Sequence, residues 1–473
     1  MKMPGFLSGI DEQRSINLAD NRCINLYPTM NDDGDIGAFI ATPGLELYAT
    51  FPTAAITSGI YTASNGRCFC VAGSVLYELT AGGTLTSRGT ITASTVSRMT
   101  DNGIDLIIVN GIDGWLFTFA TNTLAAIASA TFPNGCKTIT YINGRFIACQ
   151  PNTQNFFCSD SLAGSNLAGS IWDALNVQTA DSNPDYIVSS VASSNELIVF
   201  GEKSGEVYYD SGAYPTPFVR NSSGIFEVGC ISPYSICKAD NTVFWLGKSS
   251  TGQGVIYRLQ GYTPVRISSY SVEYAIQTMA DTSDAIAFTY QQDGHHFYVI
   301  TFPTGDRTFA YDLNTQKWHE RASFSTVTGL FSRWEAQEYA YFDNKHLVCD
   351  FSEGKIYSLE LNIYQDGGNT RKWLRSWRAP ESEMKRVPHH KLTLEIESGV
   401  GLIGGTDPQV MMRYSDDGGH TWSSELWRSM GKIGEFFKRV NWFRLGITSS
   451  YPRVYEVSGS EPVKTILLAA FLE

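Results

Sequence analysis

The chain of 473 residues is poor in charge, since Asp, Glu, Lys and Arg make up 17% of it against about 25% in an average globular protein. Its 47 acidic residues outnumber its 35 basic ones, which gives a formal net charge of −12. A protein whose outer surface grips nucleic acid needs clustered Lys and Arg to neutralise phosphates. The composition therefore argues against a nucleic-acid-binding outer surface.

Long apolar runs are also missing. The longest, Ile466–Leu472, is far shorter than the roughly 20 residues of a membrane-spanning helix. Residues 1–10 lack the apolar segment of a secretory signal peptide. The nine cysteines are odd in number and lie in apolar surroundings, which favours buried thiols made in a reducing cytoplasm over a disulfide framework.

What the chain does have is a recurring hairpin. An Asn or Asp turn, often with Gly, leads into an apolar strand, a second turn and a strand rich in Tyr or Phe. The copies begin near residues 65, 102, 143, 195, 241, 293 and 344. Repeats of about 40–50 residues are typical of the four-stranded blades of a β-propeller, whereas a pair of β-sandwiches with coincidental hairpins is the alternative. We predict an all-β protein with a propeller of six or seven blades over residues 51–370.

Helical patterns are rare in the sequence. One short helix is predicted after Ser269 or Ser271, either of which could cap it. Its apolar positions follow helical spacing: Val272, Ala275, Ile276 and Met279.

Both ends of the chain depart from the repeat. Residues 392–397 alternate strictly between apolar and polar side chains, as in a half-buried strand. We expect residues 371–473 to form a separate antiparallel, sandwich-like β-domain, joined by an N-terminal arm of residues 1–50.

Motifs for catalysis or metal binding are absent. His295-His296 and His389-His390 are adjacent pairs, and neighbours on a strand point to opposite faces, so neither pair chelates one ion easily. The chain has no Gly-x-Ser-x-Gly nucleophile elbow and no phosphate-binding P-loop. We expect no enzymatic activity, no cofactor and no metal.

One local motif resembles the Asp-box of sialidases, a stabilised hairpin turn. Side chains that bond to the turn backbone, glycines that allow positive φ and a packing tryptophan account for it. Its residues are Ser415, Asp417, Gly419, Thr421 and Trp422. A carbohydrate-active or glycan-binding propeller is therefore the alternative function.

A basic, tryptophan-containing stretch opens the C-terminal region, and a similar run follows at residues 436–445. Such a mixture fits either single-stranded nucleic acid or a protein interface, and we favour protein contact for both. The candidate contacts with other subunits or an adaptor are Arg371, Trp373, Arg375, Trp377 and Arg378.

Segments along nearly the whole chain together resemble the packaged-DNA stabilisation proteins, the tail hub or nozzle family of short-tailed bacteriophages. The order and spacing of these segments carry the resemblance. They are Gln13-Arg14-Ser15, Cys23-Ile24-Asn25-Leu26-Tyr27-Pro28, Thr42-Pro43-Gly44-Leu45, Trp172-Asp173-Ala174-Leu175, Tyr311-Asp312, Ser415-Asp416-Asp417-Gly418-Gly419 and Trp442-Phe443-Arg444-Leu445-Gly446.

The resemblance implies a structural role without catalytic residues. Members form a hexameric ring below the portal and its adaptor, contact a tail needle and tailspikes, and close the exit channel after packaging. DNA is expected to pass through the lumen without specific binding, because a net negative wall repels phosphates at close range. The expected location is the virion tail, with assembly in the host cytoplasm and no membrane contact.

Overall fold

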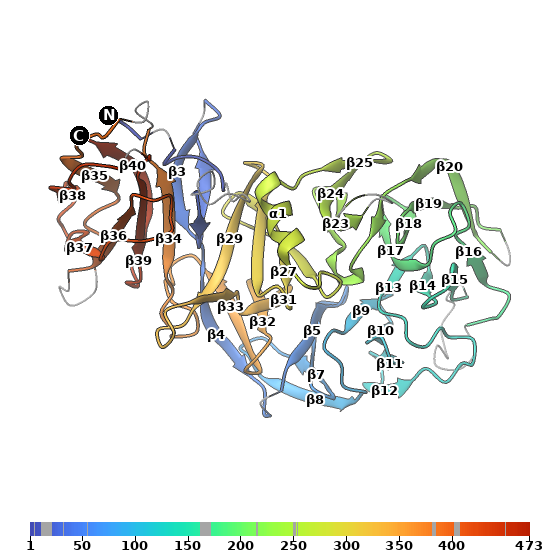
Figure 1. The fold of residues 1–473 in the computed structure, drawn as a ribbon. Helices are drawn as coiled ribbons and strands as arrows, with labels where there is room; N and C mark the ends of the chain where they lie inside the picture. Colours follow the sequence, from blue (N-terminus) through green and yellow to red (C-terminus); the bar gives the residue numbers. More distant parts are fainter. Residues whose placement is uncertain are drawn as a thin grey trace.

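The computed structural model describes residues 1–473 except 4, 11–20, 32, 54, 161–171, 214–215, 249–251, 253, 381–384, 402–406 and 450. Gln13-Arg14-Ser15, part of the family resemblance, lies outside the described residues. Within the rest, a β-propeller fills one end of the molecule and a β-sandwich the other, and both chain termini lie on the sandwich (Figure 1).

Seven blades can be counted among the described residues. This count confirms the predicted all-β propeller and shows that it has seven blades, where the sequence allowed six or seven. The first three blades contain β5 (Thr57–Thr62), β6 (Cys68–Ala72), β7 (Val75–Leu79) and β8 (Leu85–Thr90); β9 (Arg98–Asp101), β10 (Asp105–Val109), β11 (Gly114–Thr118) and β12 (Thr123–Ala126); and β13 (Ile139–Ile142), β14 (Arg145–Cys149), β15 (Asn155–Cys158) and β16 (Val177–Thr179).

The next three blades continue the pattern, and the fifth has its inner strand in two pieces. They contain β17 (Ile187–Ser193), β18 (Glu196–Gly201), β19 (Gly205–Asp210) and β20 (Phe218–Phe226); β21 (Gly229–Cys230) with β22 (Cys237–Ala239), β23 (Thr242–Lys248), β24 (Val255–Gln260) and β25 (Thr263–Arg266); and β26 (Ile286–Gln292), β27 (His295–Phe302), β28 (Arg307–Asp312) and β29 (Lys317–Phe324).

The seventh blade is completed by the N-terminal part of the chain. Its strands are β31 (Ala336–Phe342), β32 (Lys345–Asp350), β33 (Lys355–Glu360) and β4 (Gly44–Thr50). In the register of β4 with β33, Leu45 lies opposite Leu359. The arm predicted for residues 1–50 is thus divided, because the last blade needs a fourth strand and takes β4 for it.

The seven recurring turns occupy equivalent places, each between the first two strands of a blade. Their central residues adopt positive φ, for example 49° at Asn143 and 82° at Gly144. Tight hairpin turns of this kind match the twist of the strands, and Asn, Asp and Gly tolerate them best. This requirement explains why the turn chemistry repeats along the sequence.

The sandwich combines strands from both ends of the chain. One sheet runs β1 (Cys23–Ile24), β34 (Trp373–Arg378), β39 (Val454–Gly459), β36 (Gln409–Ser415) and β37 (Leu426–Ser429). The other runs β2 (Leu26–Met30), β3 (Ile36–Ala41), β40 (Ile466–Leu472), β35 (Lys391–Ile396) and β38 (Val440–Phe443). Their inner faces share one core that includes Phe39, Trp377, Trp442 and Leu467.

The two parts are joined by a continuous sheet. The outer strand of the sixth blade, β29, pairs in parallel with β1, which pairs in turn with β34. The sixth blade and one sandwich sheet therefore belong to a single sheet of ten strands, with β30 (Phe331–Arg333) attached to β29.

The helix and the cysteines follow the sequence-based expectations. Helix α1 (Tyr270–Thr278) is capped by Ser269, whose side chain accepts a hydrogen bond from the amide of Val272. All nine cysteines are free thiols, and Cys237 alone is not fully buried. Across the described ranges, the model contains no helix with the length and apolar character of a membrane span.

Candidate interaction surfaces

Strand β34 carries most of the side chains predicted to contact other chains, and it lies in the middle of the sandwich. Trp373 and Trp377 are 4% and 0% exposed and belong to the core between the two sheets. Gly459, opposite Trp373 on β39, leaves room for that indole, because a Cβ there would lie 2.6 Å from it. Both tryptophans therefore pack inside this chain and present almost no surface to another one.

Arg375 is fully buried between the tryptophans and holds the N-terminal segment. Its Nε donates to the carbonyl of Phe6 at 2.9 Å, and its Nη2 donates to those of Gly5 and Ser8 at 3.0 Å. Burial lowers the pKa of Arg375 to about 10. The carbonyl oxygens stand in for the carboxylate that a buried guanidinium usually finds.

The two remaining candidates lie at the two ends of the strand, Arg371 just before it and Arg378 as its last residue. Arg371 is 6% exposed and donates to the carbonyl of Thr42, whereas Arg378 is half-buried at the strand's end. Four of the five candidate side chains are therefore engaged inside this chain. Their role in contacts between chains stays a prediction, and the geometry of the single chain offers little surface there.

The Asp-box residues form the turn between β36 and β37. The Oγ of Ser415 donates to Asp417 at 2.7 Å and accepts from the amide of Gly419 at 2.8 Å. The amide and hydroxyl of Thr421 both donate to Asp417, and these bonds hold the pKa of that carboxyl well below its usual range. The ring of Trp422 lies 4.6 Å from the guanidinium carbon of Arg413. The carboxylate is thus occupied by the turn itself.

A group of exposed apolar side chains comes from β37, β38 and the loop between them, at the end of the sandwich away from the propeller (Figure 1). We call this group the edge patch. It consists of Trp427, Ile433, Phe436, Phe437 and Phe443, which are 49%, 58%, 66%, 100% and 58% exposed. The run of residues 436–445 pointed to part of it. Trp427 and Ile433 carried no signal, because isolated apolar residues in a sequence do not show whether they face inward.

Side chains from the second, fifth and seventh blades meet at the axis of the propeller. Arg98 on β9 pairs with Glu338 on β31 at 2.5 Å. It also lies 5.3 Å from the ring centre of Tyr234, in the short helix η2 (Pro233–Ser235) of the fifth blade. Because β9 and β31 are innermost strands of their blades, this cluster occupies the centre of the propeller.

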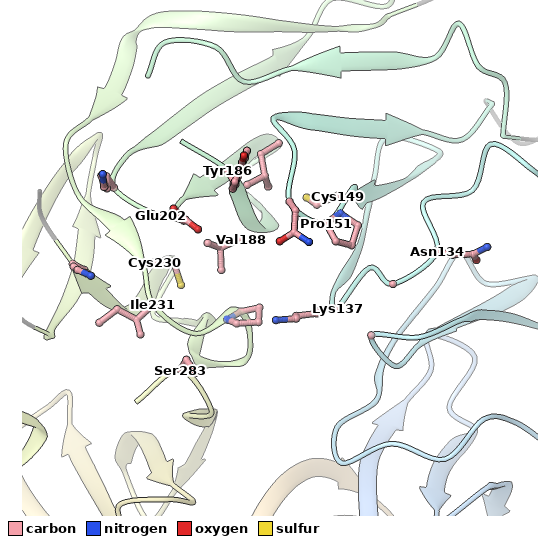
Figure 2. Close-up of a pocket in the computed structure, with 17 residues that line it drawn as sticks. Asn134, Lys137, Cys149, Pro151, Tyr186, Val188, Glu202, Cys230, Ile231 and Ser283 are labelled. Atoms are coloured by element: carbon pink, nitrogen blue, oxygen red, sulfur yellow. The ribbon is translucent and has the colours of Figure 1, made fainter. Parts of the chain in front are cut away.

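A cavity of about 660 Å³ opens on the propeller face opposite the recurring turns. Figure 2 shows Lys137 reaching into it and Glu202 and Val188 facing it from another blade. Pro233 lines its wall, next to Tyr234 of the axial cluster. Its lysines and Glu202 are exposed, so the cavity is a hydrated depression, and no buried polar group identifies a ligand for it.

Two family models match this chain, and their descriptions refer to the same phage protein. A model described as "Bacteriophage P22 Gp10, beta-propeller" matches residues 1–364, and one described as "Bacteriophage P22 Gp10, beta-sandwich" matches residues 372–471. No curated protein matches the chain.

Solved structures show only distant similarity. An extracellular domain of a hybrid two-component system from B. thetaiotaomicron has 9% identity and a TM-score of 0.45, and covers 79% of this chain and 44% of that one. The N-terminal domain of Nup159 has 8% identity and a TM-score of 0.42, and covers 72% of this chain and 99% of that one. The chain spans less than half the length of the first two solved chains.

Proposed function

Because the chain belongs to the bacteriophage P22 Gp10 family of phage tail hub proteins, we propose that it is the tail hub of a short-tailed phage. In this proposal it forms a ring below the portal and adaptor. The ring closes the DNA exit channel, retains the packaged genome and anchors the tail needle and tailspikes. The observation that carries the proposal is that both family models match, in order, over nearly the entire chain.

The proposed role is structural rather than catalytic. The Asp417 carboxylate is bound within its turn, and the Arg98–Glu338 pair is buried between blades. The described residues contain no group of three or more His, Cys, Asp or Glu side chains that could hold a metal ion. Many aromatic residues and a low charge density suit broad contacts between subunits.

We propose that the DNA path lies between copies of the chain and not through the propeller. The Arg98–Glu338 cluster fills the propeller axis, whereas duplex DNA needs a passage roughly 20 Å wide, about twice the diameter of an α-helix with its side chains. A ring of copies, each with a formal net charge of −12, would surround DNA with a wall that repels phosphates.

We also propose a division of the chain into an N-terminal arm of residues 1–50, a propeller of 51–370 and a C-terminal β-domain of 371–473, with two changes. Strands β1 to β3 pair with the C-terminal strands, and β4 pairs with the propeller. Contacts within the ring are assigned to the sandwich. Deleting residues 371–473 would remove β34 and β40, the partners of β1 and β3, and leave those two strands uncovered, so point variants are the better test.

The proposal is tested on particles assembled with and without this chain. Particles that lack it are expected to lose packaged DNA to nuclease, and particles that contain it should show antibody labelling at the tail. Labelling elsewhere on the virion, or full nuclease protection without the chain, would overturn the proposal. Imaging of the tail should show the chain as a ring with a central opening.

A further inference from the structure

The edge patch exposes four aromatic side chains and Ile433, none of which belongs to the sandwich core. On β38, Val440 and Trp442 face inward and are at most 1% exposed, whereas Phe443 faces outward. Single exposed apolar residues are common on soluble proteins, but a group of them marks a binding surface. Among the described residues, β37 and β38 are each the last strand of their sheet, with no further strand paired beyond them.

The loop that carries Phe436 and Phe437 is held in place before any partner arrives. The amide of Gly434 donates to the carbonyl of Gly399 at 3.1 Å, and Nζ of Lys438 donates to Glu435 at 3.0 Å. Gly399 has a φ of 84°, and a Cβ there would lie 2.6 Å from the Phe436 ring. A loop fixed in this way loses little conformational entropy on binding.

The charge around the edge patch indicates the chemistry of its partner. Residues 426–444 hold five basic side chains and a single acid, Glu435. Residues 371–473 contain 15 Lys and Arg against 12 Asp and Glu, a formal net charge of +3. Residues 1–43, which add β1 to β3 to the sandwich, contain 3 against 6, so the sandwich as a whole is neutral and its positive charge is concentrated around the edge patch. Residues 44–370, which form the propeller, contain 17 against 29, a formal net charge of −12. The edge patch is therefore complementary in charge to the propeller.

We propose that the edge patch docks onto the acidic propeller of a second copy of this chain, an inference that rests on the proposed hub function. Because the two surfaces differ, the contact is heterologous, and repeated heterologous contacts close into a ring when the rotation allows it. The aromatic side chains supply the buried area, and Arg428, Lys432 and Arg439 supply the charge complementarity.

DNA is a poorer match for the same surface. Ile433 has no flat ring to stack on bases, and the chain as a whole carries a formal net charge of −12, which repels phosphates. Binding to DNA is therefore kept as an outcome that the experiment can reveal.

The first test is photo-crosslinking of the full-length chain with a benzoylphenylalanine at position 437. The proposal expects crosslinks from this position to residues 44–370 of another copy, which form the propeller, identified by mass spectrometry. A matched probe at Val327, which is 95% exposed on the propeller, controls for random collision. Crosslinks mainly to residues 371–473 of another copy, or none above the control, would overturn it.

The second test measures association by analytical ultracentrifugation and native mass spectrometry. F437S and R439E should each weaken association about tenfold or more, while V327S should leave it unchanged. A ring that forms equally well with F437S refutes the edge patch but keeps the hub function. Failure of the wild-type chain to form any ring, alone or in particles, refutes both. Loss of binding to a 30-base-pair duplex in F437S, with association intact, would reassign the patch to DNA.

Discussion

Arg375 shows how one buried side chain can tie together the two ends of the chain. Its donors satisfy carbonyl oxygens in the first turn of the chain, at Gly5, Phe6 and Ser8. We expect R375M to reduce the free energy of unfolding by about 3 kcal/mol, because those buried acceptors lose their partners. Urea unfolding measures this change. R378M, at the half-buried end of the same strand, should cost under about 1 kcal/mol; an equal loss in both variants would contradict the assignment.

Glu335 makes stability depend on pH. Burial, followed by the nearby charge of Asp366, raises its pKa to about 7, and its Oε2 is buried without a partner. The folded state therefore holds this proton after the unfolded state has released it. We expect this contribution to stability to be complete below about pH 4.5 and lost as the pH rises through about 7, up to about 3 kcal/mol in all.

Denaturation of E335Q across pH 4–9 tests this assignment. The variant should be more stable than the wild type at pH 8. Its free energy of unfolding should also fall much less than that of the wild type as the pH rises through about 7. A decline of unchanged size in E335Q would place the responsible group elsewhere, with Asp366, whose pKa burial raises to about 6, as the next candidate.

At the scale of elements, the sequence predicts those features that depend on neighbouring residues, such as the hairpin turns. Five of the seven turns place two neighbouring residues at positive φ, and the other two place one glycine there. This requirement restricts the residue types and leaves a visible repeat. Strand β34 was expected to present its Arg and Trp side chains to another chain. Its neighbours β1 and β39 come from distant parts of the sequence, so the coverage of both its faces has no local signature. The same holds for β4, which closes the seventh blade.

The role of β4 in closing the propeller gives a matched pair of variants on one strand. Leu45 is 1% exposed and packs in the core between the sixth and seventh blades, whereas Leu47 is 53% exposed. L45A should lower the free energy of unfolding by about 2–4 kcal/mol through lost burial and a cavity. L47A should change it by less than about 1 kcal/mol. Similar effects of both variants, measured by denaturant unfolding, would argue against closure by β4.

At the scale of the whole molecule, propeller and sandwich should unfold together. The N-terminal strands belong to both parts, and one sheet continues from β29 through β1 to β34. We expect a single calorimetric transition, shifted to lower temperature by L45A in the propeller and by W377A in the sandwich. Two separate transitions, each moved by only one of these variants, would show that the parts are independent.

The unbroken sheet between blade and sandwich also bears on how an exit could open. Because a blade and a sandwich sheet share one hydrogen-bonded sheet, we expect the two ends of the chain to move together, so that a load on one end is passed to the other. In the proposed ring, the channel would then widen by tilting of whole copies against one another and not by bending within a copy.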